Sequence, residues 1–126
     1  MNYRFSTPKN NNKGVTFSIP KQQKYRNVKK FYNGRWYDST KEADYARDLD
    51  FRVLGRDIAS WEPQIEYKFI HNDKLICAYN LDFKITHTDG TIEYIDVKSE
   101  ATRKNPVYRI KNKMMKIFYN ITITEV

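Results

Sequence analysis

The feature that most constrains the fold is a pair of alternating apolar segments, 75–86 and 92–98, joined by the short polar turn HTDGT. Alternation with a period of two is typical of β-strands, and a short turn makes the two strands antiparallel neighbours. A two-residue loop would send Asp82 and Asp96 to opposite faces of this hairpin. A three-residue loop that ends in a left-handed glycine brings them together, and Gly90 stands at that third position. We therefore expect Asp82 and Asp96 to lie side by side.

The second strand, IEYIDVK, places Lys98 two residues after Asp96 and therefore on the same face. A lone D-x-K is most often the charged end of a strand that emerges into solvent. Two aspartates directly opposite each other are different, because like charges in that position destabilise a sheet. They require either a raised pKa or a cation, and Mg²⁺ takes oxygen ligands of this kind. The pair of Asp82 and Asp96 therefore predicts a metal site.

Length and composition limit the classes of protein to consider. A chain of 126 residues is long enough for one domain with a single core. Cys77 is the only cysteine, which argues against a disulfide framework and against a cysteine-based zinc site. The first residues lack the apolar segment of a signal peptide, and no apolar run is long enough to span a membrane. We expect a soluble protein of the cytoplasm, or of the host-cell cytoplasm if the gene belongs to a phage.

The net charge of +8 is unevenly distributed. Residues 1–41 carry ten Lys and Arg against one acid, and residues 98–126 carry seven against two. Residues 42–97 carry six bases against twelve acids. Acids gathered between two basic flanks repel the phosphates that the flanks attract, which is unusual for a passive nucleic-acid binder. The distribution suits a protein whose central acids hold a metal.

The N-terminal part divides into two segments. Residues 1–20 are polar and interrupted by Pro and Gly, and we expect a mobile basic tail before a domain of residues 21–126. Residues 24–37 interleave basic and aromatic side chains around Asn33-Gly34, which predicts a small hairpin. Such alternation suits phosphate contacts and stacking on bases or sugars. Equally, the aromatic residues can simply attach the hairpin to the core.

A helix is expected from about Thr40 to Leu54, between Ser39 and Gly55. Its apolar stripe also contains Glu42, and a carboxylate that faces a core needs a partner. The alternative is specific, because Ser39 to Glu42 fits the S-x-x-E capping box, in which Glu42 only bonds the backbone. From the helix alone, the cap is favoured.

The remaining chain predicts a small α/β domain. Residues 64–70 alternate as a strand, and the turn at residues 71–73 connects them to the strand 75–86. Asn105-Pro106 begins a helix whose buried stripe is expected to be Val107, Ile110, Met114 and Ile117. The final ITITEV returns as a strand through a right-handed β-α-β crossover.

These elements together resemble the PD-(D/E)xK nuclease superfamily. The order is a helix with Glu, a strand with Asp, a hairpin, a strand with Asp-x-Lys, a basic helix and a strand. More narrowly, KYRNVKKFYNGRWYDSTKEADYARDL, YNLDF and YIDVKSE resemble a group of small phage and prophage endonucleases of the Holliday-junction-resolvase type. The resemblance covers about residues 24–126. It departs from the pattern at Asn80-Leu81, where the proline of the name is missing, and at Asp96, where Glu is commoner.

The resemblance implies a restriction-endonuclease-like core, with a mixed sheet of four to five strands flanked by helices. It implies a catalytic set of Glu42, Asp82, Asp96 and Lys98, and it makes Glu42 a site residue rather than only a cap. Asp82, Asp96 and the Val97 carbonyl would hold one or two Mg²⁺ ions, which Mn²⁺ would replace. Glu42 would orient the attacking water or a second ion, and Lys98 would position that water or bind the scissile phosphate. Gln64 is a further candidate for the site.

The expected activity is metal-dependent hydrolysis of DNA phosphodiester bonds, selective for branched DNA, in phage recombination or DNA processing. A homodimer is expected, because one small chain has one active site and a symmetric cut needs two. The residues expected to contact DNA are Lys24, Arg26, Lys29, Lys30, Arg35, Arg103, Lys104, Arg109 and Lys113.

Other classes stay open. A non-catalytic DNA- or RNA-binding module would explain the basic aromatic segment but not the converging acids. A structural or anti-host interaction protein would need no cation, and a carboxylate-pair glycosidase fits the basic flanks least well. Transposition-type and restriction-type nucleases share the same core, so the fold does not decide the substrate.

Overall fold

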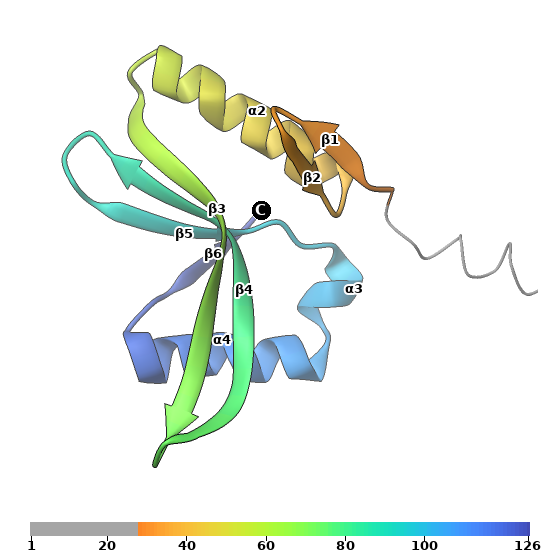
Figure 1. Cartoon of the computed structure of the whole chain (residues 1–126), viewed down its shortest axis with the longest axis vertical. Helices are drawn as coiled ribbons and strands as arrows, with labels where there is room; N and C mark the ends of the chain where they lie inside the picture. Colours follow the sequence, from red (N-terminus) through yellow and green to blue (C-terminus); the bar gives the residue numbers. More distant parts are fainter. Residues whose placement is uncertain (1–27) are drawn as a thin grey trace, which may run out of the picture.

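A computed structural model describes residues 28–126 of the chain. The elements follow in the order β1 (Lys30–Tyr32), β2 (Arg35–Tyr37), α2 (Thr40–Leu54), β3 (Ile58–His71), β4 (Lys74–His87), β5 (Ile92–Asp96), α3 (Glu100–Arg103), α4 (Pro106–Tyr119) and β6 (Ile123–Glu125). Figure 1 shows α2 beside one end of the long β3–β4 hairpin and α4 beside the other. The predicted tail of residues 1–20, together with Lys24 and Arg26, lies outside the described residues.

Four strands form the main sheet in the order β3-β4-β5-β6, and β1 and β2 form a separate two-stranded sheet. β4 is antiparallel to both β3 and β5, whereas β6 is parallel to β5. Helices α3 and α4 lie in the connection between the two parallel strands. The predicted α/β class, with a mixed sheet and a β-α-β unit at the C-terminal end, is confirmed.

The β1–β2 hairpin turns at Asn33 and Gly34, whose φ angles are 49° and 84°. Positive φ at both central residues matches a type I′ turn, the turn that Asn-Gly favours most strongly. The hairpin predicted from this dipeptide is confirmed. It is attached to α2 by an ion pair between Lys30 Nζ and Asp44 Oδ1 at 3.0 Å.

Helix α2 begins and ends where the sequence predicts. The Ser39 hydroxyl caps its first turn, and the chain leaves the helix at Gly55. Its buried apolar face packs against the sheet in a group that we call the α2 cluster: Tyr37, Ala43, Ala46, Leu49, Ile58, Phe83, Ile85, Ile95 and Val97. This cluster holds the N-terminal end of α2 over strands β4 and β5.

Helix α4 has the predicted ends but not the predicted face. Asn105 caps its first turn and Asn120 ends it with φ 56°. Val107, Ile110 and Ile117 are exposed, and the buried residues are Tyr108 and Met115. The predicted stripe is therefore wrong at these three positions, whereas Met114, its fourth member, is half-buried. Apolar residues lie on two faces of this helix, and the face that meets the sheet is the one with a tyrosine, whose hydroxyl donates to Glu125 of β6.

The buried side of α4 belongs to a second group, the α4 cluster: Phe69, Tyr79, Leu81, Tyr108, Met115, Ile121 and Ile123. Strand β4 thus contributes Leu81 to the α4 cluster and Phe83 to the α2 cluster. Asp82 lies between them. Strand β3 is longer than the predicted residues 64–70, and it connects to β4 through Asn72 and Asp73, which have φ angles of 51° and 63°.

Candidate functional site

Asp82 and Asp96 lie next to each other on strands β4 and β5. The pairs Phe83–Ile95 and Lys84–Tyr94 fix a register that places residue 82 opposite residue 96. The loop that sets this register closes with a hydrogen bond from Gly90 N–H to the His87 carbonyl at 2.9 Å, and Gly90 has φ 90°. The predicted three-residue loop and the predicted pairing are both confirmed.

The two aspartates are joined through the backbone at this point. The Asp82 N–H donates to Asp96 Oδ1 at 3.1 Å, and the Val97 N–H donates to Asp82 Oδ2 at 2.8 Å. Each carboxylate therefore accepts a bond from the neighbouring strand, where the regular ladder ends. This exchange holds both side chains in defined positions.

Asp96 is completely buried, with a relative exposure of 0 %. Its Oδ2 atom accepts no hydrogen bond from the described residues, and its closest cation is Lys98 Nζ at 3.7 Å. Burial raises the pKa of Asp96, and the nearby Lys98 charge opposes that rise. An unpartnered carboxylate oxygen in such a place is costly unless another positive group reaches it.

Glu42 lies in the capped first turn of α2 and faces the site. Its N–H donates to Ser39 Oγ at 3.1 Å, which is one half of a capping box. Its Oε2 atom accepts from the Ser39 hydroxyl at 3.5 Å, and no bond from the Ser39 N–H to this carboxylate is found among the described residues. Its side chain is buried and lines a cavity together with Asp82. Burial, followed by repulsion from the Asp82 carboxylate, raises the pKa of Glu42 to about 7. The Glu42 carboxylate therefore faces the site rather than the backbone of the helix N-terminus.

We call this space the acidic cavity. It has a volume of about 470 Å³ and is lined by Asp38, Ser39, Lys41, Glu42, Asn80, Asp82, Val97, Lys98, Ser99 and Thr102. Asp96 lies behind it and does not line it. Burial also raises the pKa of Asp82, although the Val97 N–H opposes that rise. Sequence reasoning missed Asp38, for which a signal existed: it is the only acid in residues 1–41.

Lys98 is held by a chain of contacts from three elements. Its Nζ lies 4.9 Å from the centroid of the Tyr108 ring on α4. The Tyr108 hydroxyl donates to Glu125 Oε2 on β6 at 2.5 Å, and Glu125 Oε1 lies 3.5 Å from Arg103 Nε. These contacts direct the ammonium group toward Asp96 and the wall of the acidic cavity. Arg103, predicted to contact DNA, takes part in this chain of contacts, and its side chain stays exposed.

Gln64 lies in strand β3 directly across from Asp82, between the pairs Pro63–Phe83 and Ile65–Leu81. Its φ of 52° is unusual for a residue that is not glycine, and such conformations concentrate at functional sites. The Gln64 Oε1 atom accepts a hydrogen bond from Arg35 Nη1 of β2 at 3.3 Å. The bond connects the β1–β2 hairpin to the main sheet beside the aspartates.

A smaller space, the hairpin cavity, adjoins the acidic cavity. It measures about 290 Å³ and is lined by Lys29, Trp36, Asp38, Gln64, Asn80 and Asp82. On the other side, a space of about 570 Å³ shares Asn80, Lys98 and Thr102 with the acidic cavity and is also lined by Lys111. The acidic residues therefore lie in the middle of three adjoining hollows, with lysines in all three.

Comparison with known proteins gives a family but no activity. Residues 22–125 match the family model described as "Protein of unknown function (DUF1064)". The chain belongs to the DUF1064 family. A search of curated proteins and a search of solved structures found no match. The function of this DUF1064 protein must therefore be inferred from the chemistry of its site.

The basic residues predicted to contact DNA have different surroundings in this DUF1064 protein. Lys29 is exposed at the hairpin cavity, and Arg109 and Lys113 are exposed on α4. Lys30 pairs with Asp44, and the exposed Lys104 lies 4.0 Å from Glu100. Lys111, which was not among the residues expected to contact DNA, lines one cavity together with Lys98.

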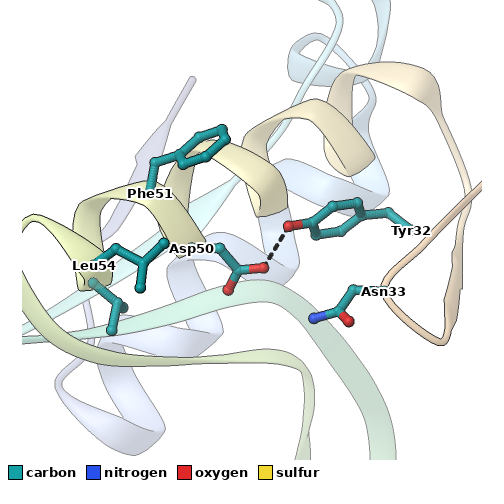
Figure 2. Close-up of a pocket in the computed structure, with 6 residues that line it drawn as sticks. Tyr32, Asn33, Asp50, Phe51 and Leu54 are labelled. Carbon is teal, nitrogen blue, oxygen red and sulfur yellow. Dashed lines mark hydrogen bonds between the residues drawn. The ribbon is translucent and has the colours of Figure 1, made fainter.

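A separate cavity between the β1–β2 hairpin and α2 is lined by Tyr32, Asn33, Asp50, Phe51, Val53 and Leu54, as Figure 2 shows. Its one carboxylate is already occupied: Asp50 accepts hydrogen bonds from the Tyr32 hydroxyl at 2.5 Å and from Trp61 Nε1 at 3.0 Å. The bond to Asp50 raises the pKa of Tyr32 to about 12. The Tyr32–Asp50 bond attaches the hairpin to α2, and the two hydrogen bonds keep the Asp50 carboxylate from binding a ligand.

The acidic cavity can be tested as a site for a dication. Within residues 28–126, no three acidic, histidine or cysteine side chains converge closely enough to form a complete metal-binding group. Mg²⁺ does not require such a group, because it is commonly bound by one or two carboxylates with waters and phosphate oxygens. Glu42 and Asp82 line one cavity with Val97, and the unpartnered Asp96 oxygen lies behind them. The donors fit a hard cation that keeps several waters.

Proposed function

We propose that this protein is a metal-dependent DNA endonuclease of the PD-(D/E)xK type that prefers branched DNA. The observation that carries the proposal is the β4–β5 register, which sets Asp82 beside Asp96, so that Asp82 lines a cavity with Glu42 and Lys98 while Asp96 lies next to it. Three carboxyl groups with raised pKa values next to one lysine are costly in a site without function.

The residues divide the work as follows. Asp82, Glu42 and the Val97 carbonyl would hold Mg²⁺, with Mn²⁺ as a substitute. This set differs from the expected one, because Glu42 lines the cavity and Asp96, expected as a ligand, does not. The bound ion supplies Lewis-acid stabilisation of the negative charge that develops on the phosphate during hydrolysis. Lys98 offers its ammonium group to a phosphate oxygen at the cavity wall. Asp96 positions Lys98 through their 3.7 Å contact. It also positions Asp82, because Asp96 Oδ1 accepts a hydrogen bond from the Asp82 N–H.

The charge around the cavity supports DNA as the substrate. Lys29, Lys41, Lys98 and Lys111 line the three adjoining hollows, and each can meet a phosphate on either side of the scissile bond. Affinity that comes from such contacts falls steeply with salt, because binding releases counterions. Restriction-type or transposition-type cleavage on the same core is the alternative among nucleases, and the choice of DNA substrate in the assay separates them.

We also propose a homodimer for symmetric cutting of a branch. The exposed Val107, Ile110 and Ile117 on α4 support this, because such a stripe on a small domain is an unusual apolar surface.

No helix among residues 28–126 combines the length and apolarity needed to cross a bilayer. The cytoplasm, or the host-cell cytoplasm for a phage protein, is the compartment that this proposal requires.

The deciding experiment compares wild type with Asp82→Asn on labelled four-way junction, duplex and single-stranded DNA, in Mg²⁺, Mn²⁺ or EDTA. Asparagine keeps an oxygen that can accept the Val97 N–H, so folding should be preserved. We expect nicking to fall at least about 100-fold while DNA binding stays unchanged. Asp73→Asn is the matched control, because Asp73 lies at the exposed turn of the β3–β4 hairpin, in a conformation that asparagine tolerates.

A non-catalytic nucleic-acid-binding module is the second candidate, favoured by the exposed basic and aromatic side chains of the β1–β2 hairpin. It would bind the same DNAs and cut none of them with either divalent ion. Full nicking activity in Asp82→Asn would refute the assignment of the site, even if the wild type is a nuclease.

A further inference from the structure

The aromatic side chains of the β1–β2 hairpin point to two different sides. Tyr37 is buried in the α2 cluster and Tyr32 is half-buried against α2. Phe31 and Trp36 remain 53 % and 62 % exposed. Their ring centroids are 5.2 Å apart with an interplanar angle of 67°, so they form an edge-to-face pair on the open side of the hairpin. The core does not account for this pair.

Trp36 lies at the acidic site. It lines the hairpin cavity together with Asp82 and Asn80, and these two residues also line the acidic cavity. A flat group that stacks on the indole is therefore adjacent to whatever occupies the space beside Asp82. In a nucleic acid, a base and the phosphate of the same nucleotide are adjacent in this way.

The hairpin presents the indole from a fixed position. The contacts Lys30–Asp44, Tyr32–Asp50 and Arg35–Gln64 attach it to α2 and β3. The Tyr37 ring stacks on Phe83 of β4 at 6.2 Å between centroids. A ring that is already oriented loses little conformational freedom when a ligand stacks on it.

Charge narrows the class of ligand. Lys29 lines the same cavity as Trp36, together with Asp38 and Asp82, whereas Arg35 lies on the other face of the hairpin and donates to Gln64. A cation beside a flat apolar ring suits a single-stranded nucleic acid, with a phosphate on the cation and a base on the aromatic face. A purely apolar protein partner would not need the cation.

We propose that Trp36, with Phe31 behind it, stacks on an unpaired base of the DNA strand whose phosphate enters the acidic cavity. The inference rests on the proposed function for DNA as the ligand, but it does not require cleavage. Bases within a duplex are already stacked on both sides, so the pair favours DNA with an unpaired nucleotide. Branch points, bulges and frayed ends provide such nucleotides. Gln64, held across from Asp82, lines the same cavity and can bond the edge of that base.

The test uses the full-length Asp82→Asn protein, so that DNA is not cut, and measures Kd by anisotropy for two duplexes of equal length. One is fully paired and the other has a single unpaired nucleotide at its centre. Trp36→Ala should weaken binding to the bulged duplex about 5- to 150-fold, the range expected for one base–aromatic stack, with little change for the paired duplex. Trp36→Phe should recover most of the loss.

Phe51→Ala is the matched control, because Phe51 is also 62 % exposed but lies on α2 in the cavity of Figure 2. It should change neither affinity. A fluorescent 2-aminopurine at the unpaired position should be quenched by the Asp82→Asn protein and not by the version that also carries Trp36→Ala. Thermal melting of each variant checks that it folds.

Equal weakening of both duplexes by Trp36→Ala, or no weakening of either, would overturn the stacking proposal. Failure of the Asp82→Asn protein to bind any DNA would overturn it as well. If the wild type cuts nothing but the bulge preference still depends on Trp36, the nuclease proposal fails and the stacking proposal stands.

Discussion

The α2 cluster and the α4 cluster are packed to different degrees. Helix α2 contributes Ala43, Ala46 and Leu49 at 1 % exposure or less, and it leaves Phe51 and Leu54 exposed near its C-terminal end. Helix α4 contributes only Tyr108 and Met115 and leaves Val107, Ile110 and Ile117 exposed. The α2 cluster is therefore the more deeply buried of the two, and both helices leave apolar side chains outside.

The acidic site lies where β4 passes from one cluster to the other. Leu81 and Phe83 are both completely buried, each in a different cluster, and Asp82 lies between them. A charged residue at such a junction removes no apolar group from either core. The α2 cluster brings Glu42 to the junction, and the α4 cluster brings Tyr108 beneath Lys98. Two small cores can therefore position one polar site between them.

The largest effect should come from Phe83→Ala. Phe83 packs its ring against those of Tyr37, Tyr45 and Trp61, so its removal leaves a cavity in the α2 cluster. We expect the free energy of unfolding to fall by about 3–5 kcal/mol. Urea denaturation followed by circular dichroism measures this loss. A loss below about 1 kcal/mol would contradict the central place of Phe83 in the α2 cluster.

Met115→Ala should cost less, about 2–3 kcal/mol, because the more open α4 cluster can relax around the gap. Met115 is completely buried, so burial alone does not set the difference between the two variants. The same urea experiment applies. If Met115→Ala destabilises more than Phe83→Ala, the ranking of the two clusters is wrong.

The pH dependence of stability should reveal Glu42. Its pKa is raised from 4.5 to about 7 in the folded protein, so folding favours the protonated form. This contribution is complete below about pH 4.5 and is lost as pH rises through 7. In EDTA, Glu42→Gln should therefore raise stability at pH 8 by about 1 kcal/mol, after allowance for solvent screening, and leave pH 4 nearly unchanged.

Thermal melts at the two pH values measure the Glu42 effect, and Glu100→Gln is the control because its side chain is 86 % exposed. Added Mg²⁺ should stabilise the wild type more at pH 8 than at pH 5, since a bound cation favours the ionised carboxylates. The absence of any Mg²⁺ effect at pH 8 would count against the metal.

The smallest effect on stability should come from Ile117→Ser. Ile117 is 78 % exposed, so the free energy of unfolding should change by no more than about 0.5 kcal/mol. Its effect should appear instead in sedimentation velocity, as a shift from dimer toward monomer. A monomeric wild type, or a dimer that Ile117→Ser leaves intact, would remove α4 as the proposed interface.

Local chemistry made much of the fold predictable. The ends of α2, the Asn33-Gly34 hairpin and the β4–β5 register all depend on one or two residues with strong conformational preferences. Gly90 alone distinguished the two registers, and that choice brought Asp82 to Asp96. Where a residue's own backbone preference decides the structure, the sequence is sufficient.

Other features depend on packing that no short segment encodes. Both faces of α4 carry apolar residues, so its periodicity could not select the buried one. The alternation around Trp36 predicted two faces but not which of them meets α2. Gln64 has a left-handed backbone conformation inside a strand, and its residue type gives no signal for it. Lys111 could not be distinguished from the other basic residues of its segment. Each of these features depends on the position of an element that is distant in the sequence.

The contacts that hold Lys98 have one more consequence. Its ammonium lies against a tyrosine ring whose hydroxyl is tied to Glu125, and Glu125 is tied to Arg103. A lysine without such contacts loses considerable side-chain conformational entropy when it binds an anion. Lys98 has already lost most of this entropy during folding. Substitutions at Glu125 or Arg103 should therefore weaken anion capture by loosening the lysine, although neither residue has to touch the anion.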